Sequence, residues 1–120
     1  MSKKTVVLGA SLKPERYSYK AVKALSNNNH EVIAIGLRKG EVNAVPIVTE
    51  EVIEKDIDTV SLYLNPARQE QYYDYILQLK PKRVIFNPGT ENPELYKLLD
   101  KNQIEKEIAC TLVLLRTNQY

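Results

Sequence analysis

The chain has 120 residues, of which 43% are hydrophobic and 27% are charged. We expect one globular domain over residues 1–120, with no room for a second domain or a long disordered tail. Lysine and arginine number 17 against 15 aspartates and glutamates. This near balance argues against a dedicated nucleic-acid binder, which usually carries a strong basic patch.

The sequence shows no targeting or membrane signal. Residues 2–4 lead directly into an apolar run, and no run approaches the roughly 20 residues that cross a bilayer. The single cysteine, Cys110, cannot form an internal disulfide, as is usual in a reducing compartment. We therefore predict a cytoplasmic protein with no membrane partner, in which Cys110 is a buried, unreactive thiol.

Apolar runs alternate with helical patterns along the chain, which is typical of an α/β fold with a parallel sheet. Strands covered on both faces read as nearly continuous apolar runs. Five such runs predict a Rossmann-like three-layer sandwich with a mostly parallel five-stranded sheet. They lie at residues 6–8, 32–35, 60–64 and 84–86, and within residues 108–115. Residues 41–48 read as a loop with room for one very short edge strand.

The predicted helices begin at capping residues. The first is expected to start at Ser18, whose hydroxyl can accept a free backbone N–H, and to end within asparagines 27–29. Asn65 and Asn92 each precede a proline, and proline suits the first position of a helix. Residues 49–53 indicate one more short helix. Helices then follow most strands, as a parallel sheet requires.

The turn after the first strand is the most informative feature. Gly9, Ala10 and Ser11 link a buried strand to the start of a helix. Free N–H groups and the dipole at a helix N-terminus favour an anion, and a glycine lets the ligand approach the backbone. The dinucleotide fingerprint has three glycines and this turn has one. The turn therefore predicts a phosphate site, with Ser11 as a donor rather than a nucleophile.

The other strand ends meet this turn at one edge of the sheet, where open α/β sheets bind ligands. The second strand is followed by Arg38 and Lys39, where an NAD site usually carries an acidic residue. Two cations suit a phosphate on the ribose, which coenzyme A carries at its 3′ position and NADP at its 2′ position. The residues favour either of these ligands over NAD.

Residues suited to catalysis are few. The only histidine, His30, opens the second strand and so lies away from the binding edge, where we expect a turn or packing role. With one cysteine and one histidine, neither a metal cluster nor a Cys–His pair is expected. The cations of residues 80–83 are interpreted as a solvated turn. We expect no catalytic residue and no metal site.

These motifs, in this order, resemble the small CoA-binding proteins. That family consists of single Rossmann-like domains similar to the CoA-binding domain of the succinyl-CoA synthetase α subunit. The resemblance covers nearly the whole chain and rests on the order and spacing of its motifs. These are residues 7–11, Pro14, residues 17–18, 29–32 and 38–40, Pro46, and residues 58–60, 65–66, 87–89 and 92–94.

The resemblance implies a set of ligand-binding residues. Gly9, Ala10, Ser11, Pro14 and Ser18 match the phosphate-binding turn and the start of the helix. Arg38 and Lys39 follow the second strand, where Lys39 matches a basic residue that can face a CoA phosphate. Leu64, Asn65 and Pro66 match the loop beside the adenosine, and Asn87, Pro88 and Gly89 match the loop beside the pyrophosphate or pantetheine arm.

The chain departs from the family pattern at three places. It has residues 36–38, Gly-Leu-Arg, where the family commonly has Val-Asn-Pro. It has Asn29 where a glycine is common, and residues 109–111, Ala-Cys-Thr, where an Asp-Arg-Cys-like motif is frequent.

Three functions remain open at this point. The leading prediction is a cytoplasmic protein that binds CoA or acyl-CoA and has no catalysis of its own. The second is a redox or nucleotide sensor that binds NADP(H) in the same pocket. The third is a part of an acyl-CoA ligase. This hypothesis is the weakest, because no histidine stands at a plausible phosphorylation site. The expected partner is a small nucleotide, with no nucleic acid, and a homodimer is left open.

Overall fold

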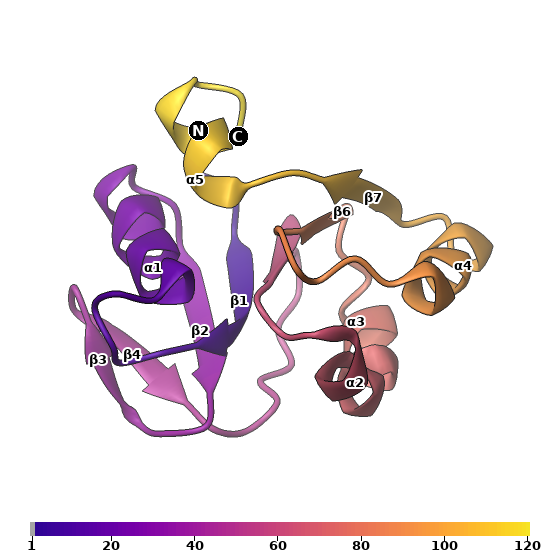
Figure 1. Ribbon diagram of the computed structural model, residues 1–120, viewed down its shortest axis with the longest axis horizontal. Coiled ribbons are helices and arrows are strands. Elements are labelled where there is room, and N and C mark those ends of the chain that lie inside the picture. Colours follow the sequence, from indigo (N-terminus) through magenta and orange to yellow (C-terminus); the bar gives the residue numbers. More distant parts are fainter. Residues whose placement is uncertain (1) are drawn as a thin grey trace.

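The computed structural model describes residues 2–120 and shows a three-layer α/β sandwich (Figure 1). The strands are β1 (Thr5–Ala10), β2 (Val32–Gly36), β3 (Gly40–Val42), β4 (Val45–Val48), β5 (Thr59–Leu62), β6 (Arg83–Phe86) and β7 (Glu105–Ile108). The helices are α1 (Tyr17–Asn27), α2 (Pro66–Gln69), α3 (Tyr73–Leu79), α4 (Pro93–Lys101) and α5 (Thr111–Arg116), with a 3₁₀ turn, η1 (Glu70–Tyr72), before α3. The predicted Rossmann-like α/β fold is confirmed.

The sheet has seven strands in the order β3-β4-β2-β1-β5-β6-β7, where the sequence predicted five. Strands β3 and β4 form a short antiparallel hairpin over residues 40–48, where the sequence predicted a loop with room for one very short edge strand. Asn43 and Ala44, both with positive φ, make its tight turn. Pro46 fits because the pairing of β4 with β2 begins one residue later, at Ile47. All other neighbouring pairs are parallel.

The predicted strand within residues 108–115 is wrong. The last strand, β7, lies earlier and reads Glu-Lys-Glu-Ile, and the apolar run forms α5 instead. An edge strand needs little apolar surface and is protected by charge, so β7 lacks the signal of a buried strand. Leu114 and Leu115 of α5 are buried against the domain, which accounts for the apolar run.

Alternate side chains of β1 pack into two separate hydrophobic cores, one on each face of the sheet. Val6 and Leu8 pack with α3 and α4 on one face, and Val7 packs with α1 and α5 on the other. Figure 1 shows these helix pairs on opposite sides of the sheet. Both faces of the central strands are therefore covered, as their continuous apolar sequences predicted. Within residues 2–120, no helix is long and apolar enough to span a membrane.

The helix caps agree with the sequence in part. The side chain of Asn65 accepts the N–H of Arg68, and that of Asn92 accepts the N–H groups of Glu94 and Leu95. Helix α1 ends at Asn27 as predicted.

Other helix predictions are wrong. Ser18 is not the first cap, because α1 begins one residue earlier without any side-chain cap. Residues 49–53 form no helix. The helix that Pro66 opens is interrupted by the 3₁₀ turn.

A cluster of polar and aromatic side chains closes the amino edge of the sheet. Arg83 is only 9% exposed, so it does not belong to a solvated turn as predicted. Its guanidinium donates to Thr59 Oγ1 at 2.8 Å and to Glu107 Oε1 at 2.9 Å, and lies 4.5 Å from the centre of the Tyr120 ring. His30 packs on the same ring, with centroids 5.0 Å apart. The histidine thus lies at the edge opposite the strand carboxyl ends, as predicted.

Stability should depend on pH through His30. Its Nδ1 accepts the backbone N–H of Lys3 at 2.9 Å. Burial lowers its pKa, as do the charges of Lys3 and Arg83, while Asp58 opposes them. The unfolded chain therefore binds this proton more readily, so stability should fall as pH drops below about 6.5. In urea denaturation at about pH 7.5 and about pH 5.5, His30→Gln should lose less stability than the wild type. Equal losses would contradict this role.

Candidate ligand-binding cleft

A cleft of about 660 Å³ lies at the carboxyl edge of the central strands. Its walls come from the loops after β1, β2, β5 and β6 and from the first turn of α1. A smaller cavity of about 320 Å³ adjoins it beside the loops after β5 and β6. The position is the one at which open parallel sheets bind ligands.

Close backbone packing forms the floor of the cleft. A Cβ on Gly36 would overlap the carbonyl oxygen of Ala10, so only glycine allows the loops after β1 and β2 to meet there. Gly9 has φ +96°, which other residues rarely adopt, and a Cβ on it would lie 3.1 Å from Leu64 Cδ2. The register between β1 and β2 shifts at the same place, between Leu8 and Ala10. The glycine of the predicted phosphate turn therefore brings the loops after β1 and β5 together.

The start of α1 opens into the cleft with its N–H groups free. Arg16 is the cap residue, and its side chain makes no capping hydrogen bond. The first helical bond joins Lys20 N to Arg16 O, so the N–H groups of residues 17–19 have no backbone partner among those described. Ser18 is buried and lines the cleft. An uncapped helix start of this kind is ready to bind an anion.

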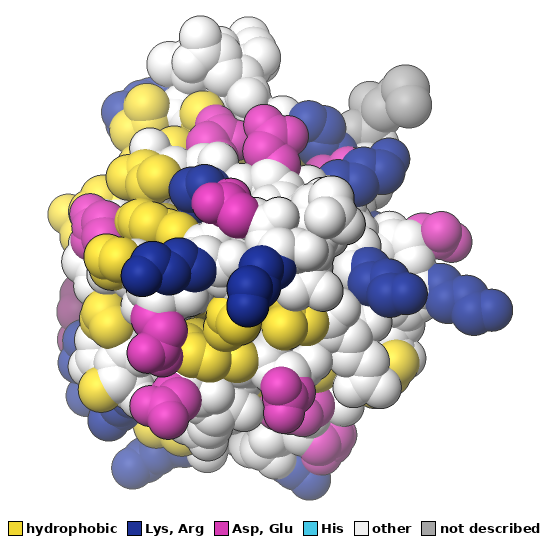
Figure 2. Space-filling model, turned by 90° about the vertical axis from the view of Figure 1, so that its right-hand side faces the viewer, with side chains coloured by type: hydrophobic (Ala, Val, Ile, Leu, Met, Phe, Trp, Pro, Cys, Tyr) yellow, Lys and Arg dark blue, Asp and Glu magenta, His cyan; other side chains and the backbone are white. Residues whose placement is uncertain are grey.

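Four cations line the larger cavity and no carboxylate does. They are Lys13, Arg16, Arg38 and Arg68. Within residues 2–120, the ion pairs are made by Lys4, Arg83 and Lys106, so none of these four has an acidic partner. Elsewhere the charges are mixed, and Figure 2 shows cations and acids interspersed over the α4 side of the molecule. The cleft therefore concentrates positive charge that the protein does not neutralise.

Nine of the thirteen predicted site residues line the two cavities. The larger is lined by Gly9, Ala10, Ser11, Ser18, Arg38, Leu64 and Pro88. Leu64 and Pro88 also line the smaller cavity, where Asn65 and Gly89 join them. Four loops that are distant in the sequence thus converge as the strand order predicts.

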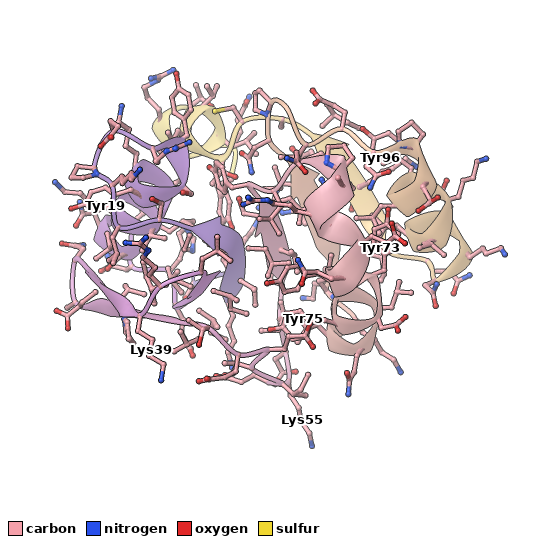
Figure 3. The ribbon with its side chains drawn as sticks, turned by 60° about the horizontal axis from the view of Figure 1, so that its bottom comes forward. Tyr19, Lys39, Lys55, Tyr73, Tyr75 and Tyr96 are labelled. Atoms are coloured by element: carbon pink, nitrogen blue, oxygen red, sulfur yellow. The ribbon has the colours of Figure 1, made fainter. Side chains whose placement is uncertain are left out.

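Four predicted residues line neither cavity: Pro14, Lys39, Pro66 and Asn87. Lys39 is exposed and points outward, away from the sheet (Figure 3). Asn87 is buried, donates to Ser61 Oγ at 2.9 Å and accepts the N–H of Thr111 at 2.8 Å. It therefore joins β6 to β5 and α5 and supports the loop that carries Pro88.

The buried environment predicted for Cys110 is also wrong, since this cap residue of α5 is half-buried.

Several lining residues were not predicted. The missed cations are Lys13, Arg16 and Arg68, and the missed aromatic residues are Tyr17, Tyr63 and Tyr72. Lys13 and Arg16 stand between the phosphate turn and the first helix, so their place in the sequence could have indicated them. Arg68 lies three residues after the Asn65 cap, in the first turn of a helix that starts at the same edge. The tyrosines carry no comparable signal, because tyrosine also packs in cores and at their rims.

Tyr63 forms a half-buried part of the wall. Burial raises the pKa of its phenol, which outweighs the nearby Thr111 and Ser61 hydroxyls that lower it. Its oxygen is buried without a hydrogen-bond partner among the described residues. The phenol therefore remains protonated over the physiological range.

A fully buried glutamine ties the two loops of the smaller cavity together. Gln69 Nε2 donates to the carbonyl oxygens of Leu64 and Thr90, each at 2.8 Å, and its Oε1 accepts from Asn92 Nδ2 at 2.9 Å. Every polar group of its amide is thus satisfied. This network fixes α2 against the loop after β6, so the walls of the smaller cavity hold their spacing.

This combination of fold and site defines a Rossmann-like domain with a cleft suited to a phosphorylated ligand. The chain belongs to the CoA binding domain family, whose model matches residues 3–116. No curated protein matches it significantly. Among solved structures, it is similar to one described as an uncharacterized protein, with 49% identity over 100% of this chain and 99% of that one and a TM-score of 0.96.

Two further structures are similar at lower identity. A hypothetical protein from Pyrococcus horikoshii OT3 is 25% identical over 96% of this chain and 83% of that one, with a TM-score of 0.81. A protein from Thermus thermophilus is 20% identical over 99% of this chain and 91% of that one, with a TM-score of 0.86. The second of these supports the fold alone.

The floor of the cleft gives a direct test of its packing. Gly36→Ala should destabilise the domain by about 3 kcal/mol, because its Cβ would meet a backbone oxygen that cannot move aside. Gly40→Ala should cost only about 1 kcal/mol, because its Cβ meets the flexible side chain of Leu12, at 2.5 Å. Urea denaturation measures both changes. A larger loss for Gly40→Ala than for Gly36→Ala would contradict this account of the floor.

Proposed function

We propose that this domain binds coenzyme A or an acyl-CoA in the cleft and carries out no catalysis of its own. The observation that carries the proposal is the group of four cations without acidic partners, which line the same cleft as the open start of α1. Membership of the CoA binding domain family supports the same ligand. The lining of both cavities includes no histidine, cysteine or carboxylate, and no cluster of three such residues occurs within residues 2–120.

The charge of the ligand fits the charge of the cleft. A phosphate monoester carries about two negative charges at neutral pH, and the diphosphate of CoA adds more. Arginine binds phosphate through two parallel hydrogen bonds, and such charged bonds are roughly twice as strong as neutral ones. A ligand with a single weak charge would leave most of these cations unpaired. The cleft therefore favours a nucleotide with a diphosphate and a further phosphate on its ribose.

NADP(H) is the second candidate, because it also carries a diphosphate and a ribose phosphate. The same cations support it, and a nucleotide or redox sensor would use the same cleft. Calorimetry of the purified chain with CoA, followed by displacement with NADPH and with desulfo-CoA, separates the two candidates. We expect heat on adding CoA and displacement by desulfo-CoA. Displacement by NADPH alone would favour the sensor, and no binding of CoA or acyl-CoA at millimolar concentration would refute the proposal.

Arg38 should recognise the ribose phosphate. It follows β2 and lines the cleft, whereas its neighbour Lys39 lies outside. Arg38→Ala should weaken CoA by about ten- to a hundredfold, the effect of losing one charged hydrogen-bonding group, and should weaken 3′-dephospho-CoA much less. Lys39→Ala is the matched control and should change neither affinity. The role is wrong if Arg38→Ala weakens both ligands equally, or if Lys39→Ala alone has an effect.

A further inference from the structure

Two arginines stand where the two cavities meet. Arg16 and Arg68 line both the larger and the smaller cavity, as do the apolar or aromatic residues Tyr63, Leu64 and Pro88. We propose that Arg16 and Arg68 clamp the diphosphate of a ligand that extends from the larger cavity into the smaller one. This inference rests on the proposed function, since it assigns parts of the CoA molecule to parts of the same cleft.

The two cavities differ in chemistry. The larger one has an apolar and aromatic wall that includes Leu12, Tyr17 and Leu37, all of which are exposed to solvent. Flat, partly apolar groups such as a purine base fit this wall. The smaller one adds Asn65, Gly89 and Thr90, and a Cβ on Gly89 would meet nothing within 4 Å, so its backbone faces open space.

A polar, extended group fits the smaller cavity. Asn65 uses its side-chain oxygen to cap α2, and its amide N–H groups have no partner among residues 2–120. They are free to donate to the amide carbonyls of a pantetheine arm, so the proposal departs from the expectation that the loop of Asn65 lies beside the adenosine. A ligand with a base at one end and an amide-bearing arm at the other places its diphosphate at the boundary.

Both arginines have free guanidinium groups on fixed backbones. Neither guanidinium makes an ion pair or hydrogen bond among the contacts of residues 2–120. The N–H of Arg68 is held by Asn65 Oδ1 at 3.0 Å, and the adjacent Gln69 anchors α2 to the loop after β6. The N–H of Arg16 is held by Lys13 O at 3.0 Å. The two charged residues therefore line one boundary from two different elements, the cap position of α1 and helix α2.

Arg16 also stands at a position where another residue would stabilise the ligand-free protein more. It occupies the cap position of α1, where serine, threonine, aspartate or asparagine stabilises a helix most. A positive charge there also opposes the helix dipole, and the first turn of α1 has no acidic residue to offset it. An anion bound at this place removes both costs. The position is consistent with a residue that serves the ligand at the expense of the free protein.

Arg68→Ala tests the clamp by the ligands that it weakens. CoA and 3′-dephospho-CoA both contain the diphosphate and the arm, so both should bind about ten- to a hundredfold more weakly. Adenosine 3′,5′-bisphosphate lacks the pantetheine arm and the outer phosphate of the diphosphate. Its affinity should therefore fall less. Arg68→Lys keeps the positive charge but cannot form two parallel hydrogen bonds, so its affinity for CoA should lie between those of the wild type and Arg68→Ala. Arg116→Ala, on the exposed side of α5, is the matched control and should change nothing.

Arg16→Ser tests the cost to folding. It should weaken CoA and 3′-dephospho-CoA to a similar degree while raising the thermal midpoint of the ligand-free protein by a few degrees, because serine caps the helix. A residue with only a structural role would not shift the two measurements in opposite directions. Unchanged affinity in both Arg16→Ser and Arg68→Ala, with the wild type binding CoA, would overturn the clamp and leave the proposed function intact. Failure of the wild type to bind CoA would overturn both.

Discussion

The close approach of two strand ends is the constraint on which the cleft depends. Gly36 lies so near the carbonyl oxygen of Ala10 that no side chain fits between them, and Gly9 allows a similar approach to Leu64. These contacts bring the loops after β1, β2 and β5 to one point. The start of α1 and the cations on these loops then face a common space. Without this packing the charges would lie apart on the surface, where water and salt screen them.

The concentrated charge has a physical consequence for the free protein. Four cations share one cleft with the positive end of a helix and no acidic side chain, so they repel one another. A buried cation at the opposite edge of the sheet has a different environment. Arg83 is paired with Glu107 and covered by Tyr120 at the opposite edge. The protein itself therefore neutralises this buried arginine, whereas the four cations of the cleft can be neutralised by a bound anion. Binding should accordingly stabilise the fold.

Sequence reasoning worked where one local signal determines the outcome. Buried parallel strands read as apolar runs, and Asn65 and Asn92 cap helices before proline, so the fold class and the main loops could be predicted. It failed where tertiary context decides. Strand β7 is charged because it is an edge, and the 41–48 segment pairs only because β2 offers it a partner. Within the site, the sequence could not tell which of two adjacent cations faces the cleft, and the structure distinguishes Arg38 from Lys39. Arg68 lines both cavities because α2 packs beside the loop after β6, a contact between segments that are distant in the sequence.

The most direct test of the account is to map where CoA binds on the native chain. Titration of the ¹⁵N-labelled protein with CoA, followed by NMR, reports on every backbone N–H at once. The account predicts saturable shifts that centre on Gly9 to Ser18 and on the loops after β2, β5 and β6, with the signals of His30 and Tyr120 at the amino edge unchanged. The account would be contradicted by shifts that cluster at the amino edge of the sheet. It would also be contradicted if no signal shifted at saturating CoA.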